Sequence, residues 1–89
     1  MTGRERAAFR AEANALQPIF QIGKGDINDN LVQSVSEALQ KRELIKLSVL
    51  DTAGVDAKQA AAVLAEATGA EIIQCIGRRF VLYRQRTEE

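Results

Sequence analysis

The sequence contains no histidine and no tryptophan, and it has a single cysteine, Cys75. Without imidazole the chain lacks the commonest general base and a frequent metal ligand, and a cysteine nucleophile would lack its usual partner. One cysteine cannot form an internal disulfide, which fits a reducing compartment and leads us to expect a cytoplasmic protein. We therefore expect no enzyme, no small-molecule substrate, no metal and no cofactor.

Long apolar runs are also missing. None approaches the roughly 20 residues that span a bilayer, and the first ten residues lack the apolar stretch of a secretory signal, so we expect no membrane partner. The 89 residues, 46% of them hydrophobic, instead predict one globular domain over residues 1–89. With three Phe and one Tyr, the core must consist mainly of aliphatic side chains.

Neither sign of charge predominates, because 12 basic residues face 12 acidic ones. This balance counts against a strongly basic nucleic-acid binder, for which a high pI is the usual sign. The distribution of charge matters more than its total, however. Residues 77–86 hold four arginines and no acid, and residues 40–50 hold three basic residues against Glu43 alone.

The apolar pattern, the glycines and Pro18 divide the chain into seven elements. We predict a helix within 1–16, a strand at 19–22, helices at 29–42 and 57–68, and strands at 44–50, 71–76 and 79–84. Asn28 suits the start of the second helix, and Asp56 with Gln59 resembles a capping box for the third. In that third helix Ala60, Val63, Leu64 and Ala67 form the expected apolar stripe.

The resulting order is α-β-α-β-α-β-β. Two β-α-β units predict right-handed crossovers between parallel strands. The last two strands are separated by Gly77 and Arg78, and glycine at the first central position predicts a type II′ hairpin. The expected fold is a two-layer α/β domain with a four-stranded mixed sheet, followed by a disordered tail at 87–89.

Basic residues gather at three places. In "IGKGD", Lys24 between Gly23 and Gly25 could offer an ammonium and backbone amides to a phosphate. A plain turn with one exposed lysine explains these residues more simply, because glycine is common in loops. Lys41 and Arg42 have a sufficient structural role at the negative end of a helix dipole.

Lys46 and the hairpin tip are harder to explain by structure alone. Lys46 lies in the middle of a strand, where no obvious acid neutralises it. Gly77, Arg78 and Arg79 place two adjacent arginines at a turn, and arginine suits bidentate phosphate contacts. A hairpin tip must be polar in any case, so both interpretations stay open. Arg84 extends the basic character of the last strand.

Taken together, "QIGKGDINDNLVQSVSEALQKRELIKLSVL" and "TGAEIIQCIGRRFVLYR" resemble the bacterial stand-alone CRM-domain proteins of the YhbY type. The most specific parts are "ELIKL" (43–47), "TGA" (68–70), and Ile76-Gly77 followed by "VLYR" (81–84). Their order and spacing match the family over nearly the whole chain.

The resemblance implies a fold similar to the C-terminal domain of translation initiation factor three. In that fold the last strand inserts antiparallel between the second and third strands of the sheet. The resemblance also implies RNA as the partner. Bacterial members are associated with precursors of the large ribosomal subunit, and plant relatives act in group II intron splicing.

Binding in the family is attributed to a glycine-containing basic loop, likened to the GXXG loop of KH domains, and to nearby basic side chains. The positions that match the family here are Gly77, Arg78 and Arg79, with Lys24 between Gly23 and Gly25. Together with the basic residues singled out above, the candidate RNA-binding residues are Gly23, Lys24, Gly25, Lys41, Arg42, Lys46, Gly77, Arg78, Arg79 and Arg84. Phe80 replaces the second glycine of the loop, so we expect arginine side chains to supply more of the contact. The alternative is a module that joins ribosomal particles through protein contacts, which the neutral charge favours.

Overall fold

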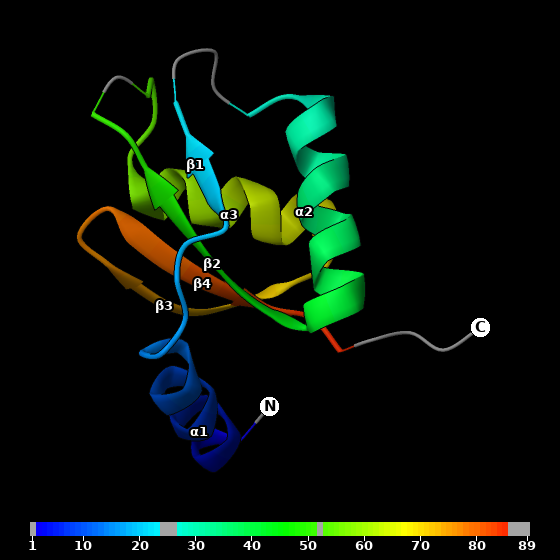
Figure 1. The fold of residues 1–89 in the computed structure, drawn as a ribbon, viewed down its shortest axis with the longest axis vertical. Coiled ribbons are helices and arrows are strands. Elements are labelled where there is room, and N and C mark those ends of the chain that lie inside the picture. Colours follow the sequence, from blue (N-terminus) through cyan, green and yellow to red (C-terminus); the bar gives the residue numbers. More distant parts are fainter. Residues whose placement is uncertain (1, 24–26, 52, 86–89) are drawn as a thin grey trace.

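The computed structural model describes residues 2–23, 27–51 and 53–85 (Figure 1). The elements are α1 (Gly3–Ala13), β1 (Phe20–Ile22), α2 (Asp29–Arg42), β2 (Leu44–Val49), α3 (Ala57–Thr68), β3 (Glu71–Ile76) and β4 (Arg79–Tyr83). The predicted order is confirmed. Helix α1 ends at Ala13, sooner than the predicted 1–16. After it, Ala15 N donates to Glu12 O and Leu16 N to Ala13 O, so the hydrogen bonds span three residues, as in a 3₁₀ turn, instead of four. The tail predicted at 87–89 lies outside the described residues.

The four strands form one mixed sheet in the order β1-β2-β4-β3. Strand β1 is parallel to β2, and β4 is antiparallel to both β2 and β3. The last strand therefore lies between the second and third, as the resemblance implied. This central place explains why Phe80, Val81 and Leu82 are all buried, since both faces of β4 are covered there.

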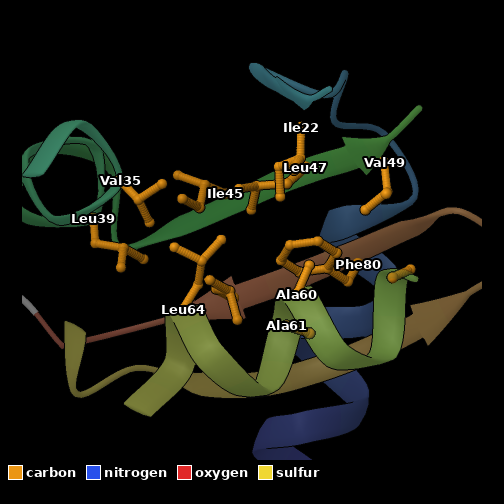
Figure 2. Close-up of a cluster of buried hydrophobic side chains, with 12 residues drawn as sticks. Ile22, Val35, Leu39, Ile45, Leu47, Val49, Ala60, Ala61, Leu64 and Phe80 are labelled. Carbon is orange, nitrogen blue, oxygen red and sulfur yellow. The ribbon is translucent and has the colours of Figure 1, made fainter. Parts of the chain in front are cut away.

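The face formed by alternate residues of β2 packs against α2 and α3. Ile45, Leu47 and Val49 lie on it, as their spacing predicts, and Phe80 and Leu82 of β4 join them. Figure 2 shows the side chains of β2 and Phe80 of β4 meeting Leu64, Ala60 and Ala61 of α3, with Val35 and Leu39 of α2 alongside. This is the main core of the domain.

Helix α1 covers part of the opposite face, which adds a partial third layer to the two that were predicted (Figure 1). A smaller cluster of Ala13, Leu44, Ile73 and Val81 forms beneath it, with Phe9, Leu16 and Tyr83 packed at its margin. Arg6 holds the helix in place, because its guanidinium donates to Ile72 O at 2.6 Å and lies 3.6 Å from Glu71 Oε2.

Helix caps agree with the sequence, but the stripe predicted for the third helix is partly wrong. Asp56 and Gln59 form the expected capping box, and Gly69 closes α3 with φ of 73°. Ala60 and Leu64 are buried as predicted, whereas Val63 is 49% exposed and Ala67 is exposed. The buried face also includes Ala57, Ala61 and Thr68. Alanines surround this helix, so apolarity could not decide which of them faces the core.

Tyr83 links α1 to the end of β4, and its titration gives a prediction. Its ring stacks on Phe9 with centroids 4.2 Å apart. Burial raises the pKa of the phenol, and the carboxylates of Glu43, Glu5 and Glu71 raise it further. A raised pKa means that the folded state favours the neutral phenol, so this contribution is complete below the unfolded value of about 10. Stability should then fall as the pH rises through the folded pKa.

We expect the Tyr83→Phe variant, which keeps the stacked ring, to lose less stability than the native protein above about pH 10. Denaturant unfolding at intervals from pH 8 to 11 measures the difference. Comparison with the variant removes the common contribution of the lysines, which titrate in the same range. Parallel curves for the two proteins would contradict the expectation.

Candidate nucleic-acid interface

The hairpin tip is a two-residue turn formed by Gly77 and Arg78, between the paired residues Ile76 and Arg79. Gly77 has φ of 60°, and Arg78 is not among the residues with positive φ, which is the type II′ geometry that was predicted. A Cβ added to Gly77 would meet nothing within 4 Å, so backbone conformation rather than space requires glycine here. Arg78 O accepts a 2.7 Å bond from Val49 N, which anchors the tip to the end of β2.

The side chain of Arg78 forms an ion pair with Asp51 in the loop after β2. Arg78 and Asp51 also line a hollow of about 330 Å³ between the tip and the 49–57 loop, together with Asp56. Among the described residues the two carboxylates outnumber the single arginine. The pair is exposed, so it contributes little to stability and weakens with salt. An anion at Arg78 must nevertheless compete with Asp51.

Gly23 lies at the same end of the sheet as the hairpin tip. It follows β1, and a Cβ built there would lie 3.3 Å from Leu50 Cδ1, which is a tight approach. Packing against Leu50 is therefore a structural reason for glycine at this position. Lys24 and Gly25, predicted to bind RNA with it, lie outside the described residues.

Lys46 and Arg79 lie on the sheet face that α1 covers only in part, beside the area under the helix. Lys46 is opposite Val81, and Arg79 precedes Val81 by two residues, so the side chains are diagonal neighbours. They line a hollow of about 170 Å³ with Asn14, Gln74, Ile76 and Val81. Lys46, for which the sequence left both a structural and a binding interpretation open, is therefore part of a basic surface.

Lys46 also lines a second hollow, of about 130 Å³, and Arg42 at the end of α2 lines the same space. The other described residues there are Leu16, Gln17, Ile19, Leu44 and Ile45. No carboxylate is among the described residues that line either hollow. We call Arg42, Lys46 and Arg79 the basic strip, since Lys46 connects the other two.

Arg84 and Lys41 do not belong to this strip. The guanidinium of Arg84 donates to Ser36 Oγ at 3.0 Å, to Ser36 O at 2.6 Å and to Thr68 O at 2.8 Å. It therefore ties β4 to α2 and α3. Lys41 is exposed in the last turn of α2, where its positive charge is favourable at the negative end of the helix dipole. It also interacts with another group of the protein.

Two features of this surface escaped prediction from sequence. Asp51 as the partner of Arg78 depends on the hairpin tip reaching the end of β2, which follows from the strand order. Asn14 enters the surface because α1 packs across the sheet rather than beside the other helices. No pattern of neighbouring residues in the sequence indicates either feature, because both arise from contacts between distant segments.

The CRS1/YhbY (CRM) domain family matches residues 1–84, and the chain belongs to this family. It is 41% identical over 88 residues to "Probable RNA-binding protein YqeI" of Bacillus subtilis, covering 99% of this chain and 92% of that protein. It is also 32% identical over 88 residues to "Probable RNA-binding protein MJ0652" of Methanocaldococcus jannaschii, covering 97% of this chain and 65% of that protein. These are names of RNA-binding proteins and not of enzymes, which agrees with the prediction of a non-catalytic protein.

A solved structure supports the same assignment. The solution structure of the hypothetical protein SAV1595 from Staphylococcus aureus matches with a TM-score of 0.80 and 43% identity. The match covers 99% of this chain and 92% of that one. Within the described part of the chain, no helix has the length and apolarity to cross a membrane, and no group of three or more acidic or thiol side chains is placed to hold a metal.

Proposed function

We propose that this protein is a non-catalytic RNA-binding protein of the cytoplasm that binds large-subunit ribosomal RNA or its precursor particles during ribosome assembly. Membership of the CRM family and the names of the relatives support RNA binding. The ribosomal target rests on the resemblance to the bacterial stand-alone members. The proposed contacts are with backbone phosphates, with little reading of base sequence.

The observation that carries the proposal is the basic strip. Arg42, Lys46 and Arg79 line two adjoining hollows without a carboxylate among the described lining residues. A phosphate backbone can follow such a strip, because each cation replaces a condensed counterion. The zero net charge is compatible with this surface, since acids such as Asp51 and Asp56 lie around the hollow at the tip. Lys24 stays a predicted further contact.

The alternative, a module that joins ribosomal particles through protein contacts, is favoured by the zero net charge. Ile76, which is 68% exposed next to Arg79, offers one apolar side chain for such a contact. Binding of naked large-subunit RNA at about 50 and 200 mM salt separates the two functions. Phosphate binding should weaken steeply with salt, whereas equally weak binding at both concentrations supports protein contacts. Crosslinking in cell extract that recovers only messenger fragments would contradict the ribosomal assignment.

Replacement of Arg78 and Arg79 together by alanine should weaken RNA binding. The slope of log K against log salt should fall in magnitude by about one to two, because the double variant removes the Arg79 contact and any contribution of Arg78. Arg79→Ala alone should account for most of the change, since Arg78 is paired with Asp51. Lys58→Ala on α3, across the sheet from the strip, is the matched control and should leave the slope unchanged. An unchanged slope in a folded double variant would remove the tip from the mechanism.

A further inference from the structure

The aromatic side chains of this protein all pack against other parts of the fold, and three of the four are half-buried, which bears on the kind of RNA that it can bind. The four aromatic residues are Phe9, Phe20, Phe80 and Tyr83, and the structure describes every one of them. Phe80 is fully buried and Phe20 packs against the main core. Phe9 and Tyr83 stack on each other. Many proteins that read single-stranded RNA by its bases stack those bases on free aromatic rings, and neither hollow of the basic strip has one.

The accessible edge of Tyr83 is not an alternative platform for bases. It lines a separate hollow of about 200 Å³ that also contains Glu5 and Glu71. The only basic side chain among the described lining residues is that of Arg84, which is already bonded to Ser36 and Thr68. A nucleotide there would bring its phosphate close to two carboxylates, which repel it.

The basic strip itself has the size and chemistry for a nucleic-acid backbone. Hollows of about 130 and 170 Å³ are below the 300–1,000 Å³ typical of pockets that enclose a ligand. The side-chain amides of Asn14 and Gln74 lie beside Lys46 and Arg79, and neither amide is hydrogen-bonded within the described residues. An amide can donate to or accept from a ribose 2′-hydroxyl, the group that distinguishes RNA from DNA.

Helix α1 adds a further positive charge to this surface. Arg10 lies one turn before Asn14 on α1, and Asn14 N donates to Arg10 O at 3.2 Å. Residues four apart share one side of a helix, so Arg10 lies on the same side of α1 as Asn14. Arg10 is exposed and forms no ion pair with the described residues. Because Arg6 bonds α1 to β3, the position of this charge relative to the sheet is held by that contact.

We propose that the RNA bound along the basic strip is double-helical. Arg10, Arg42, Lys46 and Arg79 contact its phosphates, and Asn14 and Gln74 contact ribose hydroxyls across the shallow minor groove. Double-stranded RNA displays its 2′-hydroxyls there and is recognised by shape rather than by stacked bases. The inference rests on the proposed function and names the class of RNA for the same surface. Arg10, Asn14 and Gln74 are binding residues that sequence did not indicate.

The test compares three probes of equal length in a fluorescence anisotropy assay at fixed salt. The probes are an RNA hairpin with a long duplex stem, an RNA of the same length and base composition whose sequence is rearranged so that it cannot pair, and the DNA hairpin of the first sequence. We expect at least tenfold tighter binding to the RNA duplex than to either other probe. Equal or tighter binding of the single strand would overturn the inference.

Variants of Arg10 on α1 and of the amides of Asn14 and Gln74 test the proposed contacts one by one. Arg10→Ala should lower the magnitude of the salt slope for the RNA duplex by about one, whereas Lys58→Ala should not change it. Replacing Asn14 and Gln74 together by alanine should reduce the difference in affinity between the RNA and DNA duplexes and leave the salt slope unchanged. If the double variant keeps its native circular dichroism and the full difference in affinity between RNA and DNA duplexes, the amides do not contact the 2′-hydroxyl.

Failure of the inference can be told from failure of the proposed function. If the protein binds naked large-subunit RNA but prefers the single-stranded probe, the function stands and the class of RNA is wrong. If it binds neither the duplex nor large-subunit RNA in a salt-dependent way, the function itself is contradicted. Binding to a ribosomal particle without binding to its naked RNA would point to a protein partner, which also overturns the inference.

Discussion

Replacing Phe80 with alanine is expected to lower the free energy of unfolding by about 3–5 kcal/mol. Phe80 is fully buried on the central strand, between Leu47 of β2 and Cys75 of β3 in the sheet register. Figure 2 shows its ring against Ala60 and Ala61 of α3, whose short side chains cannot fill the space that the ring would leave. Domains are stable by only about 5–15 kcal/mol, so this loss would bring a small domain close to unfolding.

Denaturant unfolding followed by circular dichroism measures the effect. Ile76→Ala is the matched control, since Ile76 lies in the same hairpin but is 68% exposed, and its removal should change stability by less than about 0.5 kcal/mol. Similar losses in the two variants would contradict the packing described for Phe80. The same burial explains why this position cannot serve as the second glycine of a KH-like loop, because the chain has already entered β4.

Arg84→Ala is expected to lower the free energy of unfolding by about 1.5–3 kcal/mol, the usual worth of hydrogen bonds to a charged group. The variant removes the guanidinium that donates to Ser36 O and Thr68 O, where β4 meets α2 and α3. Lysine cannot restore the lost geometry, because a single ammonium lacks the planar fork of donors. Arg84→Lys should therefore recover only part of the stability.

The same variant decides whether Arg84 contacts RNA, as its place in the "VLYR" motif suggested. Because its guanidinium is committed to α2 and α3, we expect Arg84→Ala to leave the salt slope of RNA binding unchanged. Arg79→Ala should lower that slope without a comparable loss of stability. A reduced slope together with native stability in Arg84→Ala would restore Arg84 to the binding surface.

Features set by a few neighbouring residues could be predicted from the sequence. The capping box at Asp56 and Gln59, the glycine at the first position of the hairpin turn, and the inward face of β2 all follow from local backbone and side-chain preferences. The strand order came from the family resemblance, because nothing local places β4 between β2 and β3. Once that order is known, the pairing of Lys46 with Val81 follows from the register.

The composition of the surface could not be predicted in the same way. Arg78 and Arg79 are neighbours in sequence, yet Arg78 pairs with Asp51 while Arg79 lies with Lys46 on the part of the sheet face that α1 leaves open. The two side chains diverge because side chains alternate at the start of a strand. Arg84 resembles them in sequence but is tied to two helices. Equal charges thus acquire different roles through contacts with distant segments.

The place of β4 in the sheet also constrains how the chain can fold during synthesis. Strand β4 is the last of the seven elements to be made, yet it supplies the pairing partners of both β2 and β3. Until residues 79–83 have left the ribosomal tunnel, the sheet lacks its centre and the main core lacks Phe80 and Leu82. A nascent chain that ends at Ile76 therefore holds two unjoined parts of a sheet, and the basic strip is completed in the same step that closes the domain.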